Sequence, residues 1–166
     1  PQSYWVRFVS IGQLRGIVVD RSLQLRQHAL EGAWQLVQQH PWLGVGLGNF
    51  GDHAPRFMLG RFLAHNSFME VAATVGVVGG LAYVALLAAG WDMTRRAAGQ
   101  WERAGRRADQ ALAAALGVSL LAFCLSALAL SFPFYFILWI LLGLANAARR
   151  LATRAAAAAG PASLSA

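Results

Sequence analysis

The sequence predicts an all-α protein that crosses a membrane about three times, and three observations support this fold class. Of the 166 residues, 57% are hydrophobic and only 13% are charged, which differs from an ordinary soluble domain. Long apolar runs occupy residues 67–91 and 111–148, and both are long enough to form membrane helices. Basic residues gather between and after these runs, as they do in loops that flank membrane helices.

The charged residues favour a phosphate-bearing partner. All 14 basic residues are arginine, against seven acids, for a net charge of +7. Arginine contacts phosphate through a planar fork, so this bias fits membrane lipids or a lipid-linked phosphate. The arginines fall in separate loops and not on one aromatic-bearing face, so we expect no nucleic acid partner. The single cysteine, Cys124, excludes an intrachain disulfide.

Residues 1–66 are predicted to lie outside the membrane as an interfacial segment, an amphipathic helix and a loop. Residues 1–19 do not form a sufficiently long and uninterrupted apolar run for a spanning helix, because arginines stand among their apolar residues. Residues 22–39 form a helical pattern with one apolar face, made of Leu30, Ala33, Trp34 and Val37.

Arg26 lies on the same face of this predicted helix, one turn before Leu30. A charge is out of place on a core-facing stripe. Arg26 therefore either points at a polar group in a cleft or snorkels at a membrane interface. The residues alone leave both interpretations open.

The helix is predicted to end at His40, because the residue before Pro41 is pushed out of the helical region. The glycines that follow predict a tight loop that approaches the membrane helices closely: Gly44, Gly46, Gly48 and Gly51. Residues 46–51 match the dinucleotide pattern G-x-G-x-x-G, but no strand is predicted before them, and we reject a nucleotide site.

The first long apolar run begins with a helix start signal. Ser67 and Glu70 fit a capping box, in which the serine caps an amide and the glutamate reaches back. A continuous helix over residues 67–91 would be about 37 Å long and would cross a bilayer. A small-residue stripe for close helix packing is predicted within it, formed by Ala72, Gly76 and Gly80.

His65 lies just outside the start of this helix, where the helix dipole favours an anion such as a phosphate. A histidine beside such a site is suited to general-base catalysis. The alternative is that His65 and Asn66 only finish the turn and cap the helix. Asp52 and His53 lack a recognised ligand spacing with His65, so we expect neither a metal nor a cofactor.

The remaining sequence predicts a loop, a membrane hairpin and a tail. Residues 92–110 carry five arginines against three acids and are expected to face the cytoplasm, which puts His65 on the periplasmic side. Residues 111–148 are too long for one crossing, so a turn is predicted at Pro133, which would start the last helix. Residues 149–166 are predicted to form a disordered cytoplasmic tail.

Three spaced motifs, between about residues 22 and 87, together resemble a known family. An arginine on an amphipathic helix is followed by P-x-x-G-V-G-x-G-N-F, then by H-N-S-F-x-E and a span with G-V-V-G-G. The combination resembles the C-terminal half of the O-antigen ligase and polymerase superfamily of bacterial membrane glycosyltransferases. Members of that superfamily have roughly ten or more membrane helices. The chain is therefore interpreted as a C-terminal fragment that lacks N-terminal helices of the same protein.

The resemblance implies glycan transfer from an undecaprenyl-pyrophosphate carrier to an acceptor hydroxyl, at the periplasmic face of the bacterial inner membrane. His65 would orient or deprotonate the acceptor, and Arg26 would hold the pyrophosphate leaving group. Further substrate contacts are expected from Asn66, Glu70, Arg21 and Arg15. We expect the fragment alone to be inactive.

The acceptor separates several functions within this superfamily. We favour the ligase type, which uses the lipid A-core, while a polymerase would use a growing glycan and an O-oligosaccharyltransferase a protein serine. In a non-enzymatic transporter or assembly subunit, His65 and Arg26 would only stabilise loops. Transporters tend to place ionisable residues at mid-membrane, and the predicted spans have none there, which disfavours that class.

Overall fold

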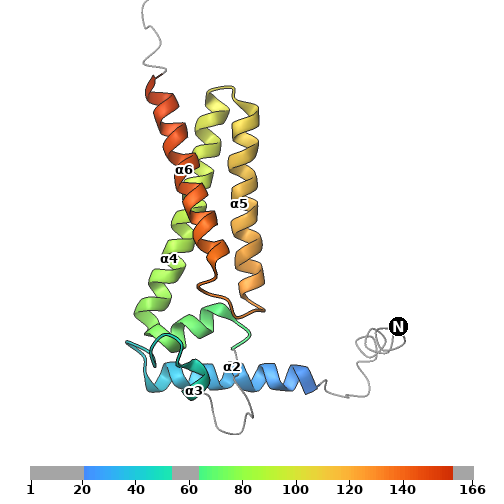
Figure 1. Cartoon of the computed structure of the whole chain (residues 1–166), viewed down its shortest axis with the longest axis vertical. Helices are drawn as coiled ribbons and strands as arrows, with labels where there is room; N and C mark the ends of the chain where they lie inside the picture. Colours follow the sequence, from blue (N-terminus) through green and yellow to red (C-terminus); the bar gives the residue numbers. More distant parts are fainter. Residues whose placement is uncertain (1–20, 54–63, 159–166) are drawn as a thin grey trace, which may run out of the picture.

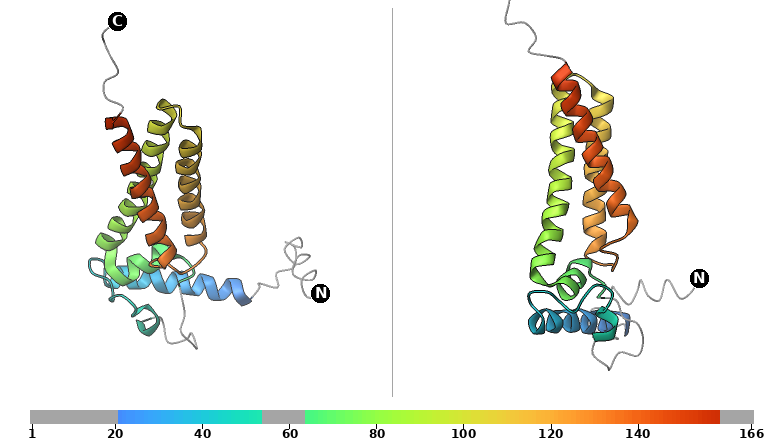
Figure 2. Two further views of the ribbon diagram at one scale, coloured as in Figure 1. Left: turned by 45° about the horizontal axis from the view of Figure 1, so that its top comes forward. Right: turned by 60° about the vertical axis from the view of Figure 1, so that its left-hand side comes forward.

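The computed structural model describes residues 21–53 and 64–158, and within them the secondary structure is entirely helical. The helices are α2 (Arg21–Gln39), α3 (Phe50–His53), α4 (Ser67–Arg103), α5 (Arg107–Ala127) and α6 (Phe136–Ala158). The long helices α4, α5 and α6 form a bundle, and α2 lies crosswise at one end of it (Figures 1 and 2). The all-α fold class is confirmed. The predicted interfacial segment of residues 1–19 lies outside the described residues.

Three of the described helices, α4, α5 and α6, are long and apolar enough to cross a membrane. Their outward faces carry exposed large apolar side chains, among them Leu81, Leu112, Leu121 and Trp139. Such a surface suits lipid or further helices better than water. The prediction of about three membrane helices is therefore confirmed.

The interior of the bundle is closed by large apolar side chains that meet from all three helices. Tyr83 and Leu87 of α4 pack in one cluster with Phe123 of α5 and Leu138 of α6. Further along α4, Gly90 is buried, and a Cβ there would lie 2.6 Å from a methyl group of Leu142. The missing side chain therefore lets α6 approach α4 closely.

The continuous helix predicted over residues 67–91 is wrong, because α4 is interrupted at Gly76, where φ is 74° and ψ is 179°. Residues 67–75 lie across the end of the bundle near α2, and residues 77–103 rise through the bundle (Figure 1). At 1.5 Å per residue the first part is about 14 Å long, too short to cross a bilayer, and the second is about 40 Å. The predicted stripe of Ala72, Gly76 and Gly80 is also wrong, since the backbone turns at its middle residue.

The loop predicted over residues 92–110 is mostly helical. α4 continues to Arg103 and α5 begins at Arg107, so only residues 104–106 connect them. Arginine, alanine and glutamine are good helix formers. Ion pairs one turn apart add support on either side of the connection: Arg96 with Asp92 at 2.7 Å, and Arg106 with Asp109 at 2.6 Å.

The last helix begins later and ends later than the sequence predicts. Pro133 does not start it, because residues 128–135 form the connection and α6 runs from Phe136 to Ala158. The tail predicted to be disordered is therefore helical up to Ala158, as expected for a run of alanines and arginines. Residues 159–166 lie outside the described residues.

Candidate active site at the interrupted helix

The loop after α2 replaces hydrogen bonds that α4 loses at Gly76. In an unbroken helix the carbonyls of Ala73 and Thr74 would accept from amides four residues later. Here Ala73 O accepts from Val45 N at 3.0 Å, and Thr74 O accepts from Gly46 N at 2.8 Å. Both carbonyls that the interruption would leave open are thus paired with the loop.

The first amide after the interruption is paired in the same way, since Val77 N donates to Pro41 O at 2.7 Å. An unpaired backbone group costs several kcal/mol in lipid, so a broken membrane helix is tolerated only where other protein groups satisfy it. Residues 41–46 and 73–77 therefore act as one structural feature, which we call the loop-and-break unit.

Gly44 and Gly76 make this close approach possible. Their φ angles of 65° and 74° lie in the left-handed region that favours glycine. A Cβ on Gly44 would also overlap the backbone of Thr74, and a Cβ on Gly76 would overlap the carbonyl of Trp42. The predicted approach of the glycine loop to the membrane helices is confirmed, and its target is the interruption of α4.

α2 packs against the first part of α4 through small and apolar side chains. One buried cluster contains residues of α2, α3 and α4 together with Ala64, namely Ala33, Leu36, Val37, Phe50, Ala64 and Ala73. Ala33 and Val37 are buried as predicted, whereas Trp34 is 53% exposed and does not belong to the packed face. The buried face of α2 is therefore rotated slightly about the helix axis relative to the predicted apolar face.

Arg26 lies on this packed face of α2, one turn before the buried Ala29 and two turns before Ala33. Its own side chain is exposed, because it precedes the first buried residue of the face. It forms no ion pair with another described residue. Arg26 is therefore an exposed residue of α2 that precedes the part of the helix packed against α4.

His65 stands between a buried residue and a helix cap. Ala64 before it is fully buried in the cluster with α2, and Asn66 after it caps α4. Its φ of 50° lies in the left-handed region, which is uncommon outside glycine. Strain of this kind persists only where the surroundings hold it, and it gathers at functional sites. The side chain is partly exposed.

The N-cap of α4 is Asn66. Its side-chain oxygen accepts from Phe68 N at 3.0 Å and from Met69 N at 3.1 Å. The predicted capping box of Ser67 and Glu70 is therefore wrong, because an equally good capping residue stands one position earlier. Two amides at this helix end are already occupied, so they are not available to a bound phosphate.

Ser67 is tied instead to the connection between α5 and α6. Its buried hydroxyl donates to Leu130 O at 2.7 Å and accepts from Phe132 N at 3.1 Å. The contact joins the start of α4 to a segment more than 60 residues later. Ser67 thus fixes where the first turn of α4 lies against the bundle.

Glu70 has a buried carboxylate oxygen, Oε2, with no hydrogen-bond partner among the described residues. Such an atom needs an explanation, and a bound ligand is one. Glu70 lies one turn after Asn66 and therefore on the same side of the helix start. His65, Asn66 and Glu70 thus all belong to the first turn of α4 or to the residues directly before it.

For the three arginines predicted to belong to the site, the structure gives less information. Arg26 belongs to α2, and no hydrogen bond joins it to His65, Asn66 or Glu70 within the described part of the chain. Arg21 is the first residue of α2, and its side chain, like the whole of Arg15, lies outside the described residues. The site roles of all six residues stay predictions.

An apolar pocket of about 260 Å³ lies beside this site, and the sequence analysis did not foresee it. Its lining comes from α2 and from both parts of α4: Trp34, Val37, Phe68, Met69, Ala72, Val77, Gly80, Leu81, Tyr83 and Val84. The hydroxyl of Tyr83 is buried and has no hydrogen-bond partner among the described residues. No signal in the sequence could have found this pocket, because the interruption at Gly76 brings its two sides together.

Metal ligands do not gather here. Over the two described ranges, no group of three or more histidine, cysteine, aspartate or glutamate side chains is placed to hold a metal ion.

Comparison with known proteins points to the same region. Residues 7–84 match the sequence model of a family described as O-antigen ligase. A comparison with curated protein sequences gave no match. The matched residues include the whole loop-and-break unit and the three polar residues at the start of α4. Residues 7–84 are therefore similar to the O-antigen ligase family, and the match supports the resemblance to the O-antigen ligase and polymerase superfamily.

Proposed function

We propose that the protein works as a membrane glycosyltransferase of the O-antigen ligase type. It would transfer a glycan from an undecaprenyl-pyrophosphate carrier to a hydroxyl of the lipid A-core. One observation carries this proposal: the family match contains His65, which has a strained backbone and a partly exposed side chain at the capped start of α4. The first turn of the same helix carries Glu70, whose buried carboxylate oxygen has no partner among the described residues.

In this proposal His65 accepts the proton of the acceptor hydroxyl. The acceptor oxygen attacks the anomeric carbon, and the bond from that carbon to the pyrophosphate oxygen breaks with inversion. Positioned acid–base groups of this kind contribute about 10²–10⁴-fold to a rate. Arg26 then stabilises the negative charge that develops on the pyrophosphate, which remains on its carrier lipid.

Asn66 and Glu70 would hold the acceptor or donor sugar. The side-chain oxygen of Asn66 is used for capping, which leaves its amide N–H groups to donate to a sugar hydroxyl. The unpaired oxygen of Glu70 would accept a hydrogen bond from a sugar hydroxyl. Arg21 and Arg15 would add positive charge from the start of α2 and the segment before it.

The apolar pocket beside the site supports a lipid-linked donor. Its lining is almost entirely apolar and it lies next to Phe68 and Met69, one turn or less from His65 along the chain. An isoprenoid chain needs such a surface, because each buried CH₂ contributes about 0.8 kcal/mol. We propose that this pocket takes the part of the carrier nearest to the pyrophosphate.

The distribution of arginine supports a periplasmic site on the bacterial inner membrane. At the opposite end of the bundle from the loop-and-break unit lie Arg95, Arg96, Arg103, Arg106, Arg107, Arg149, Arg150 and Arg154. By the positive-inside rule this end faces the cytoplasm. The start of α4 would then face the periplasm.

The test is glycan transfer by full-length protein in membranes, comparing wild type with His65→Ala and His65→Gln. Both variants should lose about a hundredfold or more of the rate, since neither side chain can act as a general base. His28→Ala is the matched control, because His28 is an exposed histidine on α2. Normal transfer by both His65 variants at equal protein levels would remove the catalytic role.

The same assay identifies the acceptor. Glycan appearing on the lipid A-core supports a ligase, whereas lengthening of carrier-linked glycan indicates a polymerase. Glycan attached to a protein serine indicates an O-oligosaccharyltransferase. Wild-type membranes with none of these products would favour a non-enzymatic role.

A further inference from the structure

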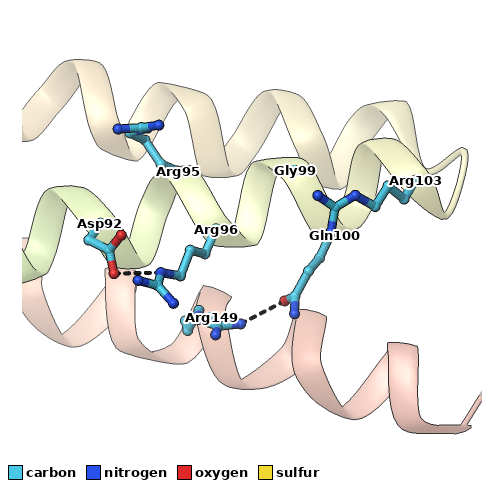
Figure 3. A pocket seen from close by; sticks show the side chains of 7 residues that line it. All are labelled: Asp92, Arg95, Arg96, Gly99, Gln100, Arg103 and Arg149. Atoms are coloured by element: carbon cyan, nitrogen blue, oxygen red, sulfur yellow. Dashed lines mark hydrogen bonds and ion pairs between the residues drawn. The ribbon is translucent and has the colours of Figure 1, made fainter.

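A second pocket lies at the far end of the bundle, away from the loop-and-break unit. It has a volume of about 370 Å³ and is formed between the last turns of α4 and the middle of α6 (Figure 3). Its lining is polar and strongly basic: Asp92, Arg95, Arg96, Gly99, Gln100, Arg103 and Arg149. None of these residues has a part in the proposed glycan transfer.

The charge in this pocket is positive even after internal pairing. Arg96 forms an ion pair with Asp92 at 2.7 Å. Arg95, Arg103 and Arg149 form no ion pair with any other described residue. The ion pair uses only Nε of Arg96, so Arg96, Arg103 and Arg149 can all offer N–H groups to an anion. Arginine binds a phosphate with two parallel hydrogen bonds.

Arg149 is held in place across the gap between the helices. One of its terminal nitrogens donates to Gln100 Oε1 at 2.9 Å and to Thr153 Oγ1 at 2.9 Å. In Figure 3, Arg96 and Gln100 point from α4 toward α6, and Arg149 meets them from the opposite side. A guanidinium has five N–H donors, so further donors of Arg149 stay free and are pre-positioned for a ligand.

The depth of the pocket in the membrane identifies the source of the anion. A bilayer core about 30 Å thick is crossed by about 20 helical residues. Counted from the interruption at Gly76, such a crossing reaches the headgroup level near Ala97, in the middle of the pocket-lining stretch of α4. Trp91, one turn earlier than Arg95, is 40% exposed, as is usual for tryptophan at a membrane interface.

We propose that this pocket binds the phosphate of an anionic phospholipid, such as phosphatidylglycerol. The phosphate lies among Arg96, Arg149 and Arg103, and the acyl chains lie on the exposed apolar faces of the bundle. A bound lipid joins the last turns of α4 to α6 and so steadies the end of the bundle opposite the active site. The proposal requires only that α4 and α6 cross a membrane, and it does not depend on glycan transfer.

The test measures lipid binding to the full chain in detergent micelles by native mass spectrometry. The probes are phosphatidylglycerol, phosphatidylcholine and inorganic pyrophosphate. The pocket variant is Arg96→Gln with Arg149→Gln. The control is Arg107→Gln with Arg150→Gln, which removes the same charge at exposed positions outside the pocket. Far-UV circular dichroism checks that both variants remain helical.

Wild type should bind phosphatidylglycerol more tightly than phosphatidylcholine. The pocket variant should lose on the order of tenfold or more in affinity for phosphatidylglycerol, and the control less than about twofold. An equal loss in both variants would overturn the site and leave only diffuse positive charge. Unchanged binding by the pocket variant would also overturn it. If pyrophosphate displaces phosphatidylglycerol at a comparable concentration, the ligand is a soluble phosphate and the assignment to lipid fails.

Discussion

At the start of α4, Asn66 binds the first amides of the helix and Ser67 binds the connection between α5 and α6. These are separate tasks at neighbouring positions. Asn66 stabilises a helix end, which is a local interaction worth about 1 kcal/mol. Ser67 pairs two backbone groups of a distant segment through part-buried hydrogen bonds.

Replacing Ser67 with alanine should lower the stability of the bundle by about 1 to 3 kcal/mol. The variant leaves the carbonyl of Leu130 and the amide of Phe132 without their part-buried hydrogen-bond partner, and a donor or acceptor that loses its partner away from water costs about 1 to 3 kcal/mol. Ser119→Ala is the control, since the exposed Ser119 hydroxyl bonds only within its own helix, to Ala115 O. The midpoint of thermal unfolding in detergent measures both. Equal midpoints for the two variants would contradict this role of Ser67.

Arg26 can be tested by separating charge from geometry. If its guanidinium grips a phosphate, Arg26→Lys keeps the charge but loses the two-point contact, so donor turnover should fall on the order of tenfold or more. Arg26→Ala should be worse. The measurement is turnover of the lipid-linked donor in reconstituted membranes, with Arg107→Lys as the control at the other end of the bundle. A lysine variant within about twofold of wild type would indicate a snorkelling arginine.

At the scale of elements, the interruption of α4 and the glycine loop stabilise each other. Neither is favourable alone: the interruption opens backbone groups, and the loop holds glycines at positive φ. Together they pair those backbone groups. The first part of α4 thereby lies across the end of the bundle instead of continuing through it.

Gly76→Ala should destabilise this unit far more than Gly48→Ala. Both glycines have positive φ, so both substitutions strain the backbone, and at Gly76 the ψ of 179° adds a conformation almost confined to glycine. A Cβ on Gly48 meets no atom within 4 Å, whereas a Cβ on Gly76 overlaps the carbonyl of Trp42 and pushes the loop away. We expect an additional loss of about 1 to 3 kcal/mol for Gly76→Ala.

Thermal unfolding in detergent measures this difference, and glycan transfer provides a second readout. Transfer should fall in Gly76→Ala and stay close to wild type in Gly48→Ala. Equal effects of the two substitutions on unfolding would show that strain alone matters, and the role of the loop as a partner for the interruption would then be wrong.

At the scale of the whole molecule, the two ends of the bundle differ in chemistry. One end carries the loop-and-break unit and the polar start of α4, and the other carries the basic ends of α4 and α6 (Figure 2). Because both ends lie outside the apolar core of the bundle, the protein presents a different surface to each side of a membrane. The proposed transfer requires the first end to face the lipid-linked donor.

The orientation can be tested with single cysteines in a Cys124→Ala background. A cysteine at Glu102, near the short connection between α4 and α5, should react only with reagents that cross the inner membrane. A cysteine at His53, at the end of α3, should react with impermeant reagents added to the periplasm. The opposite pattern would place His65 in the cytoplasm and exclude transfer from a periplasmic donor.

The sequence by itself determined the features that depend on composition and local periodicity. Hydropathy predicts the number of membrane helices. A helix that crosses the bilayer pairs its backbone groups internally and needs about 20 apolar residues, so each such run can be counted in the sequence. The helical pattern of residues 22–39 predicts α2, since Pro41 ends it, and the observed helix spans Arg21–Gln39. The motifs that resemble the O-antigen ligase superfamily were also visible in the sequence, and the family match covers them.

Only the tertiary structure decided where α4 is interrupted and what its first residues bind. Hydropathy could not predict the interruption at Gly76, because the side chains before and after this residue are equally apolar. The interruption is stable only because residues 41–46, about 30 positions earlier, pair its open backbone groups. In the same way Ser67 looks like a local cap, but its partners Leu130 and Phe132 lie more than 60 residues later. Such pairings depend on how the chain folds back on itself, and no local pattern encodes them.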